Sequence, residues 1–286
     1  MKEAVEQSYA MQAASEQEMK LPASYRAPES IDAWRHRRML ALVDPLCRAL
    51  PDSTWMTVGD GRYGSDAAYL QARGVRVRAT SLTDEKLQQA HAMGHIADFA
   101  AENAERISSA DGSFDFVLCK EAYHHFPRPP IALYEMLRVC RIGAVLIEPI
   151  DNPRLLDGFK SLVKRILRGN VDQQFEPSGN FIYRPSVREM RKLMLAFGGE
   201  LLAWRGINDF YHARLINHRH APGSLPTLAT QAGIAVQDAL CGLRLLGYGL
   251  ACVVIFKAGA PEPVRAALRA AGFAVEVLPR NPYLAH

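Results

Sequence analysis

A glycine-rich segment, Gly59-Asp60-Gly61-Arg62-Tyr63-Gly64, follows the short apolar stretch Trp55–Val58 and precedes a helical pattern over Ser65–Ala72. Because glycine has no Cβ, such a segment allows a tight turn and lets a ligand approach the backbone N–H groups that begin a helix. The spacing G-x-G-x-x-G is typical of nucleotide-binding α/β folds. Chance matches to this motif are common, so the surrounding pattern decides what it means.

Strand and helix patterns alternate along the first half of the chain. The stretches expected as strands are short and nearly all apolar: Trp55–Val58, Val75–Thr80, Phe114–Cys119 and Ala144–Glu148. Helices are expected over Ile31–Leu50, over Ser65–Ala72, from a cap at Thr83 to Gly94, and from Pro129 to about Cys140, where Gly143 ends the pattern. This alternation predicts a parallel sheet covered on both faces by helices.

After Glu148 the pattern changes. Leu155–Arg168 is predicted to be an amphipathic helix that covers the active site, and Ser186 with Glu189 predicts a capping box for the next helix. Further elements are expected as strands at Glu200–Trp204, Leu250–Lys257 and Phe273–Leu278, and as helices around Thr227–Leu245 and up to Ala271. We expect residues 1–50 to form an N-terminal helical arm or cap, and residues 51–286 to form the main domain with a substrate-cap insertion at about 152–199.

Composition argues against several classes of protein. The net charge is only +4, without one long basic run, which does not call for a nucleic-acid partner. The first twenty residues are polar, and the longest apolar runs are too short to span a bilayer, so a cytoplasmic protein without membrane segments is expected. The five cysteines are odd in number and widely spread, which predicts reduced thiols.

Several segments give the glycine loop a specific context. Asn103-Ala104-Glu105 is followed by Asp111-Gly112-Ser113-Phe114-Asp115-Phe116-Val117, then by Tyr123-His124-His125-Phe126 with Pro129, and then by Ala132-Leu133-Tyr134-Glu135-Met136-Leu137-Arg138-Val139. Over roughly Thr54–Pro149 the chain resembles the class I S-adenosylmethionine (SAM)-dependent methyltransferases. Arg141-Ile142-Gly143 stands where that family usually has a Pro-Gly-Gly turn. The resemblance implies a Rossmann-like sheet with helices on both faces, an N-terminal helical cap and an inserted helical segment after the fifth strand.

The resemblance also implies SAM as the cofactor and S-adenosylhomocysteine (SAH) as its product. Glycines of the loop would surround the methionine part of SAM, the end of the second strand would meet the ribose, and Asn103 with Ala104 would flank the adenine. The residues expected to bind the cofactor are Gly59, Asp60, Gly61, Arg62, Gly64, Ser81, Leu82, Asn103, Ala104 and Lys120.

Three positions where the family usually has acids carry neutral residues here. Thr57 stands two residues before the first glycine, Ser81 stands at the end of the second strand, and Asn103 stands beside the adenine. Asp60 could instead meet the SAM amine, and Arg62 its carboxylate. These departures leave open weaker SAM binding or a domain that has lost catalysis.

The methyl acceptor is expected near the carboxyl ends of the strands, where open α/β sheets bind their ligands. A hydroxyl acceptor needs a general base, and histidine titrates near neutrality. His124, His125 and Glu121 follow the fourth strand and are the candidate catalytic residues. The candidate substrate-binding residues are Tyr123, Glu148, Tyr183, Asn208, Asp209 and Tyr211.

The sequence therefore predicts methyl transfer to a small molecule in bacterial secondary or surface-sugar metabolism, with an O-methyl product favoured. No metal site is expected, because His91 with His95 and His218 with His220 lack further ligands at regular spacing. The alternatives are a non-catalytic partner protein of the same fold and an NADP-dependent oxidoreductase. The strand-rich C-terminal third could support a homodimer.

Overall fold

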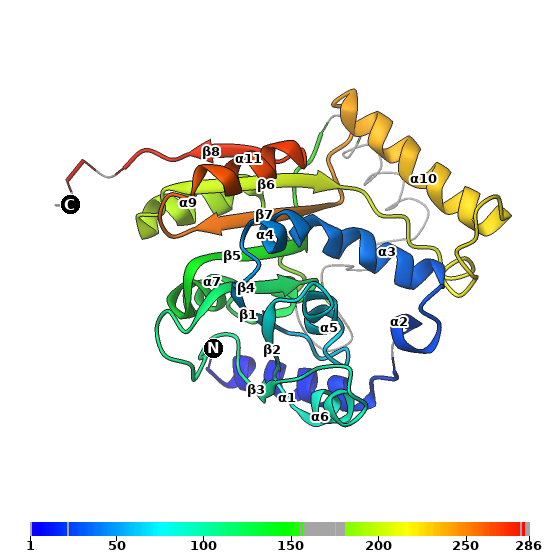
Figure 1. The fold of residues 1–286 in the computed structure, drawn as a ribbon, viewed down its shortest axis with the longest axis horizontal. Coiled ribbons are helices and arrows are strands. Elements are labelled where there is room, and N and C mark those ends of the chain that lie inside the picture. Colours follow the sequence, from blue (N-terminus) through cyan, green and yellow to red (C-terminus); the bar gives the residue numbers. More distant parts are fainter. Residues whose placement is uncertain are drawn as a thin grey trace.

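The computed structural model describes residues 2–21, 23–154, 156, 175, 181–280 and 282–283. A single mixed sheet runs through the centre of the molecule, and helices cover both of its faces (Figure 1). Its eight strands are β1 (Thr54–Val58), β2 (Arg76–Ser81), β3 (Phe99–Ala101), β4 (Phe114–Lys120), β5 (Cys140–Pro149), β6 (Leu201–Ile207), β7 (Leu250–Phe256) and β8 (Ala274–Val277).

The strand order across the sheet is β3-β2-β1-β4-β5-β7-β6-β8. The first five strands of that order are parallel, whereas β7 is antiparallel to both of its neighbours and β8 is antiparallel to β6. Parallel strands bring their carboxyl ends to one edge of the sheet, so the loops after β1, β2 and β4 meet there. The predicted Rossmann-like sheet is confirmed.

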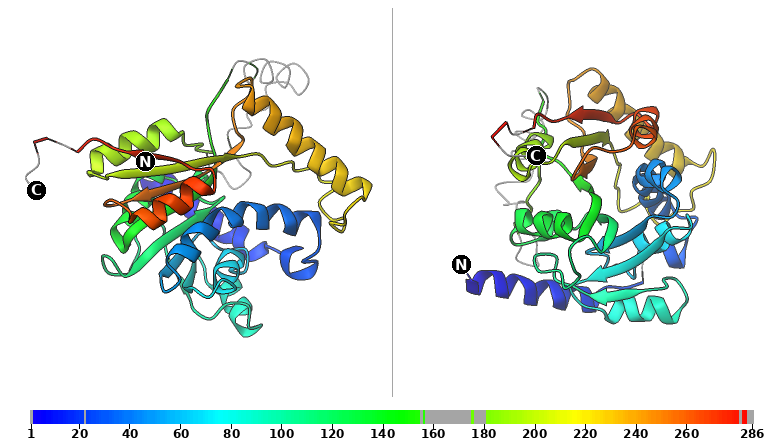
Figure 2. Two further views of the ribbon diagram at one scale, coloured as in Figure 1. Left: turned by 45° about the horizontal axis from the view of Figure 1, so that its top comes forward. Right: turned by 60° about the vertical axis from the view of Figure 1, so that its left-hand side comes forward.

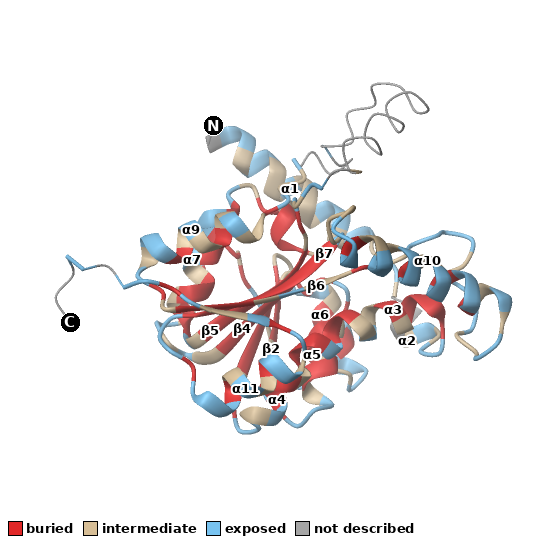
Figure 3. Cartoon of the chain, turned by 90° about the horizontal axis from the view of Figure 1, so that it is seen from above, coloured by how far each residue is buried: buried red, intermediate tan, exposed pale blue. Residues whose placement is uncertain are grey.

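Helices cover the sheet from both sides, as Figure 2 shows in two further views. They are α1 (Lys2–Glu18), α2 (Ala23–Arg26), α3 (Ile31–Leu40), α4 (Asp44–Ala49), α5 (Ser65–Gln71), α6 (Glu85–Ala92), α7 (Pro129–Val139), α9 (Val187–Phe197), α10 (Leu225–Gly242) and α11 (Glu262–Ala270). The strand interiors are buried and exposure rises toward the outer helices (Figure 3). Successive strand residues point to opposite faces, so β4 sends Val117 and Cys119 into one core and Phe116 and Leu118 into the other.

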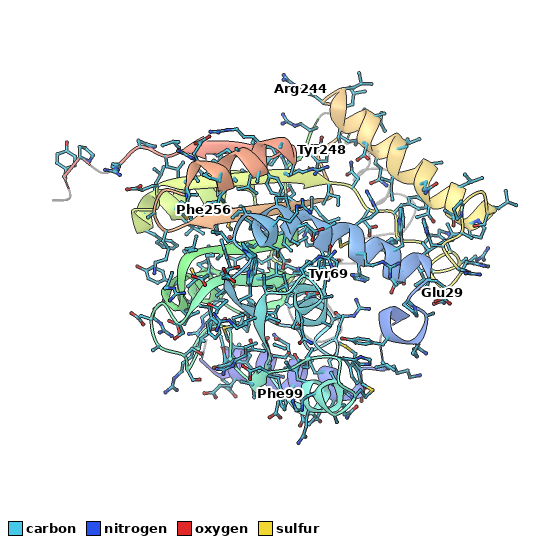
Figure 4. The ribbon with its side chains drawn as sticks, in the orientation of Figure 1. Glu29, Tyr69, Phe99, Arg244, Tyr248 and Phe256 are labelled. Atoms are coloured by element: carbon cyan, nitrogen blue, oxygen red, sulfur yellow. The ribbon has the colours of Figure 1, made fainter. Side chains whose placement is uncertain are left out.

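The two cores differ in the helices that they bury. The first core packs α7 and α9 against the sheet, and the second packs α3, α4, α5 and α11 against the opposite face. Figure 4 shows Phe256, a fully buried residue of β7, within the body of the molecule, whereas the exposed Arg244 lies beyond the end of α10. Helix α10 extends away from the sheet (Figures 1 and 2).

Several element predictions are confirmed in detail and others are wrong. The capping box of Ser186 and Glu189 is present at the start of α9. The helix predicted over Ile31–Leu50 is interrupted by a 3-10 turn at Ala41–Val43, before Pro45 in the next helix. Gly143 does not end a helix in a turn but lies within β5, where a Cβ would overlap the carbonyl oxygen of Ile255 on β7.

Two more predictions need correction at the same edge of the sheet. Asp84, rather than Thr83, is the N-cap of α6, and the three-residue strand β3 gave no recognisable pattern. The expected cap helix Leu155–Arg168 lies, except for Leu156, outside the described residues.

All five cysteines are free and buried, as predicted. None of the helices in the described part of the chain combines the length and apolar character needed to cross a membrane.

Candidate functional site

A pocket of about 400 Å³ lies at the carboxyl ends of β1 and β4, which is within the range of small-molecule sites. The loop after β1 and the loop after β4 form two of its walls, and α1 forms a third. Its lining residues from the two loops include Gly59, Asp60, Gly61, Arg62, Lys120, Glu121, His124 and His125. All eight are among the site residues predicted from the sequence. The same pocket is lined from α1 by Gln12, Ser15 and Glu16, and by Met19 directly after the helix.

The glycine loop is held in place by Asp60 from within. The Asp60 carboxylate accepts hydrogen bonds from the backbone N–H groups of Asp66 (3.2 Å) and Ala67 (2.9 Å) and from the Thr57 hydroxyl (3.0 Å). Burial, with the charge of Asp66 nearby, raises the pKa of Asp60 to about 8. Thr57 therefore supports the loop in place of the usual acid, and the carboxylate of Asp60 is occupied by the start of α5.

Gly59 and Gly61 stand where side chains do not fit. Gly59 has φ +73°, and a Cβ there would lie 2.5 Å from the Cβ of Ala122 in the loop after β4. A Cβ on Gly61 would lie 2.8 Å from the Ser81 Oγ and 3.0 Å from the Glu16 Cδ. The two glycines thus let the loop after β1 pack closely against the loop after β4, the end of β2 and α1, and their backbone lines the pocket.

Replacing Gly59 with alanine should therefore lower the free energy of unfolding more than the same change at Gly74. Both glycines have a positive φ, +73° and +82°, so either change carries the left-handed backbone penalty of about 1–2 kcal/mol. A Cβ on Gly74 meets nothing within 4 Å, whereas one on Gly59 collides with Ala122, which adds about 1–3 kcal/mol. Urea unfolding of both variants measures the difference, and equal losses would show that the loop after β4 yields freely.

Charged side chains form a connected series around the end of β4, on the wall of the pocket that faces the glycine loop. Lys120 Nζ lies 3.3 Å from both Asp66 Oδ1 and Glu121 Oε2, and Glu121 Oε2 lies 3.4 Å from His36 Nδ1 on α3. Burial alone would lower the pKa of Lys120, but the carboxylates of Asp66 and Glu121 raise it. Burial, with Lys120 nearby, lowers the pKa of His36 to about 3, so its ring is neutral at pH 7.

The backbone at Glu121 is unusual. Its φ of +50° falls in the left-handed region, which residues with a Cβ rarely adopt. Such strain persists only where the surroundings enforce it, and it is common at functional sites. Here it keeps the Glu121 carboxylate between Lys120 and His36, at the pocket wall.

His124 is held by a buried carboxylate. Its Nδ1 lies 2.5 Å from Glu148 Oε2, and Glu148 Oε1 accepts the backbone N–H groups of Ala122 and Tyr123, each at 2.9 Å. Glu148 is 1% exposed and does not line the pocket, whereas His124 does. When Nδ1–H donates to the carboxylate, Nε2 is the acceptor nitrogen of the neutral ring. This is the arrangement that orients a histidine base.

Known proteins show what kind of domain carries this pocket. The family model described as "Methyltransferase domain" matches residues 56–147. The segment is a class I SAM-dependent methyltransferase domain. The family and the SAM cofactor type that the resemblance implied are thereby confirmed, and the match covers β1 to β5 with both pocket loops.

The methyltransferase domain is also found in curated relatives. A 2-methyl-6-phytyl-1,4-hydroquinone methyltransferase of Synechocystis sp. is 31% identical over 107 residues, which cover 36% of this chain and 34% of the relative. A sarcosine/dimethylglycine N-methyltransferase of Halorhodospira halochloris is 27% identical over 174 residues, which cover 58% of this chain and 61% of the relative. The chain thus spans about a third of the first relative and less than two thirds of the second.

A solved structure shares the fold of the methyltransferase domain. The YcgJ protein of Bacillus subtilis superposes with a TM-score of 0.51 at 18% identity, covering 79% of this chain and 100% of that one. At this identity the likeness concerns the fold alone.

The groups around the pocket fit SAM. Its methionine end carries a carboxylate and an ammonium, and the wall offers the cations Lys120 and Arg62 beside the acids Asp66 and Glu121. The backbone of Gly59 and Gly61 lines the same pocket. Asn103 and Ala104 lie outside the lining, and the Asn103 Oδ1 accepts the Glu105 N–H at 2.8 Å. Gly64, Ser81 and Leu82 also lie outside it, and Gly64 is the N-cap of α5.

The residues proposed to bind substrate do not line this pocket of the methyltransferase domain. Tyr123 is fully buried in the core, and the Tyr183 hydroxyl donates to Glu189 at 3.0 Å. Asn208 is 1% exposed and joins β6 to α10 through a 2.8 Å hydrogen bond to Asp238. Asp209 pairs with Arg35 on α3, and Tyr211 is exposed beside the same guanidinium.

Sequence reasoning missed the lining residues outside the matched segment. Gln12, Ser15, Glu16 and Met19 are mainly polar, so they left no apolar stripe to mark a helix face. The spacing of the first three, i, i+3 and i+4, places them on one side of α1. His36 was likewise hidden on a helix predicted only for packing. Within the described ranges, no three His, Cys, Asp or Glu side chains come together in a way that could hold a metal ion.

Proposed function

We propose that the protein transfers the methyl group of SAM to a hydroxyl oxygen of a small-molecule acceptor, with His124 as the general base. The His124–Glu148 pair carries the proposal, because it presents an oriented imidazole to a pocket inside a methyltransferase domain. The two curated relatives are named for a hydroquinone and for small amines, which supports a small acceptor. We further place the reaction in bacterial secondary or surface-sugar metabolism.

The chemistry requires one proton acceptor and careful alignment. Bound SAM would supply an activated methyl on a sulfonium, which an acceptor oxygen would take up with SAH as the leaving group. His124 Nε2 takes the hydroxyl proton, and the Glu148 carboxylate stabilises the imidazolium that results. Lys120 and Arg62, which line the pocket, would hold the methionine carboxylate, and Asp66 and Glu121 would hold its ammonium. Most of the acceleration then comes from holding the reactants in line.

The first test is calorimetric titration with SAM, SAH and NADPH, followed by turnover of labelled SAM. The acceptor panel contains small phenols, sugar hydroxyls, amines and thiols of similar size. We expect micromolar binding of SAM and SAH, no binding of NADPH, and label transferred to a hydroxyl. Transfer only to amines would overturn the O-methyl proposal, and binding without any turnover would favour a non-catalytic partner protein.

A further inference from the structure

Helix α1 brings a carboxylate to the end of β2, where the domain itself has none. Open α/β sheets that bind nucleotides commonly place an acid about 20 residues after the glycine loop, at the end of the second strand, to bind ribose hydroxyls. In this chain that position is Ser81, the last residue of β2. The side chain that contacts Ser81 is Glu16, 65 residues earlier in the sequence.

The Glu16 carboxylate is held at that position by three hydrogen bonds. Its Oε1 accepts from the Ser81 hydroxyl at 2.8 Å, and its Oε2 accepts from the Thr83 N–H at 3.2 Å and the Thr83 hydroxyl at 2.9 Å. Thr83, expected to cap α6, thus serves Glu16 instead. A carboxylate has about four acceptor sites, so capacity remains on the side that lines the pocket.

Gly61 marks the space next to this carboxylate. A Cβ on Gly61 would lie 3.0 Å from the Glu16 Cδ and 3.1 Å from its Oε1. The carboxylate therefore packs directly against the glycine loop, and only a residue without a side chain at position 61 allows this approach. A vicinal diol in the adjoining pocket, which Glu16 and Gly61 both line, would donate to Glu16 while the attached chain continues along the loop.

Helix α1 is fastened on either side of Glu16. The Gln12 side-chain amide donates to the carbonyl oxygen of His125 at 3.0 Å, and the Gln17 amide donates to Glu85 on α6 at 3.3 Å. The helix thus crosses the carboxyl edge of the sheet from the loop after β4 to α6, and Figure 1 shows it beside α6 and β3. A ligand bound to Glu16 would lie in the pocket that α1 and the glycine loop both line.

We infer that Glu16 is the ribose-binding acid of this methyltransferase, supplied by α1 in place of an acid at Ser81, so that cofactor binding and the docking of α1 stabilise each other. The inference rests on the proposed function, because it assumes that the pocket takes SAM. It makes α1 a wall of the cofactor site.

Titration with SAH tests the inference directly. Glu16→Gln keeps the size of the side chain and removes its charge, so SAH should bind roughly 10- to 100-fold more weakly, as expected for loss of charge-assisted hydrogen bonds. Glu18→Gln is the matched control, because Glu18 is an exposed residue of the same helix. The control should bind SAH as the unchanged protein does.

A rescue variant distinguishes two roles for Glu16: binding the ribose as an acid, or only holding α1 in place. Ser81→Asp should weaken SAH binding in the unchanged protein, because it places a second carboxylate against Glu16. In the Glu16→Gln background the same change should restore most of the lost affinity, so its effect reverses sign. A change without this reversal would overturn the assignment of the acid.

Hydrogen exchange gives a readout that does not depend on the rescue variant folding. Bound SAH should slow exchange of the α1 amides in the unchanged protein and in Glu18→Gln, but not in Glu16→Gln. If the unchanged protein binds SAH and Glu16→Gln binds it equally or more tightly, the inference is overturned while the proposed function stands. If the unchanged protein binds neither SAM nor SAH, the proposed function itself fails.

Discussion

Replacing His124 with asparagine should lower methyl transfer to a hydroxyl acceptor by about 10²–10⁴-fold, the usual contribution of a general base. The Nδ1 of His124 is bound to Glu148 at 2.5 Å, so Nε2 is the nitrogen that accepts the proton. The substitution leaves the charged wall of Lys120 and Glu121 in place, so SAH affinity should stay within a few-fold of that of the unchanged protein. Single-turnover rates with labelled SAM, together with SAH titration, measure the two effects separately.

Two other histidines serve as comparisons for that result. His125→Asn alters the neighbouring ring, 3.9 Å away, which also lines the pocket, and it leaves the contact between His124 and Glu148 in place. We expect a much smaller loss of turnover there. His91→Asn, on the exposed side of α6, should have no effect. If His125→Asn loses as much turnover as His124→Asn, or more, then His124 is not the general base.

Glu148→Gln should reduce turnover by about as much as His124→Asn, although residue 148 does not line the pocket. The glutamine oxygen can keep the N–H groups of Ala122 and Tyr123, but its amide then presents donors to His124 Nδ1. The ring responds by placing its proton on Nε2, which can no longer accept one from the acceptor hydroxyl. The Asp-to-Asn change in the serine-protease triad acts in this way and costs about 10⁴-fold. Nitrogen NMR of the histidine ring should report the change of tautomer.

Removing the carboxylate altogether should also destabilise the fold. Glu148→Ala leaves two backbone N–H groups and an imidazole N–H buried without their acceptor, and each buried donor left unsatisfied costs about 1–3 kcal/mol. Urea unfolding measures this loss, with the exposed Glu18→Gln as control. Turnover of Glu148→Gln close to that of the unchanged protein would show that His124 is oriented by other contacts.

Much of the fold could be predicted because the strands of a buried parallel sheet consist of continuous runs of apolar residues. Trp55–Val58 and Phe114–Cys119 were recognisable in this way, and both lie in strands of the structure. The three-residue strand Phe99–Ala101 is too short to produce a pattern. The prediction for Gly143 was wrong because the need for a glycine there arises from the close approach of β7, which is distant in the sequence.

Some residues of the pocket could likewise be predicted from the sequence, and others could not. Glycines and polar residues that directly follow a strand could be placed from the sequence, since parallel strands end at one edge, and so Gly59, Lys120 and His124 were expected where they lie. The partners of those residues could not. Glu148 pairs with a histidine 24 residues earlier, and Glu16 reaches Ser81 across 65 residues.

The parallel part of the sheet could be predicted from local residue patterns, because burial of apolar surface leaves a periodic signal along the chain. The glycine loop and the histidines could be placed because they directly follow strands. The carboxylates that pair with these residues became evident only from the packing of distant elements. That packing placed Tyr123 in the core, tied Asn208 to α10 and brought α1 over the pocket. The reason is physical: a hydrogen bond between distant side chains depends on how elements pack, and packing geometry has no counterpart in local residue spacing.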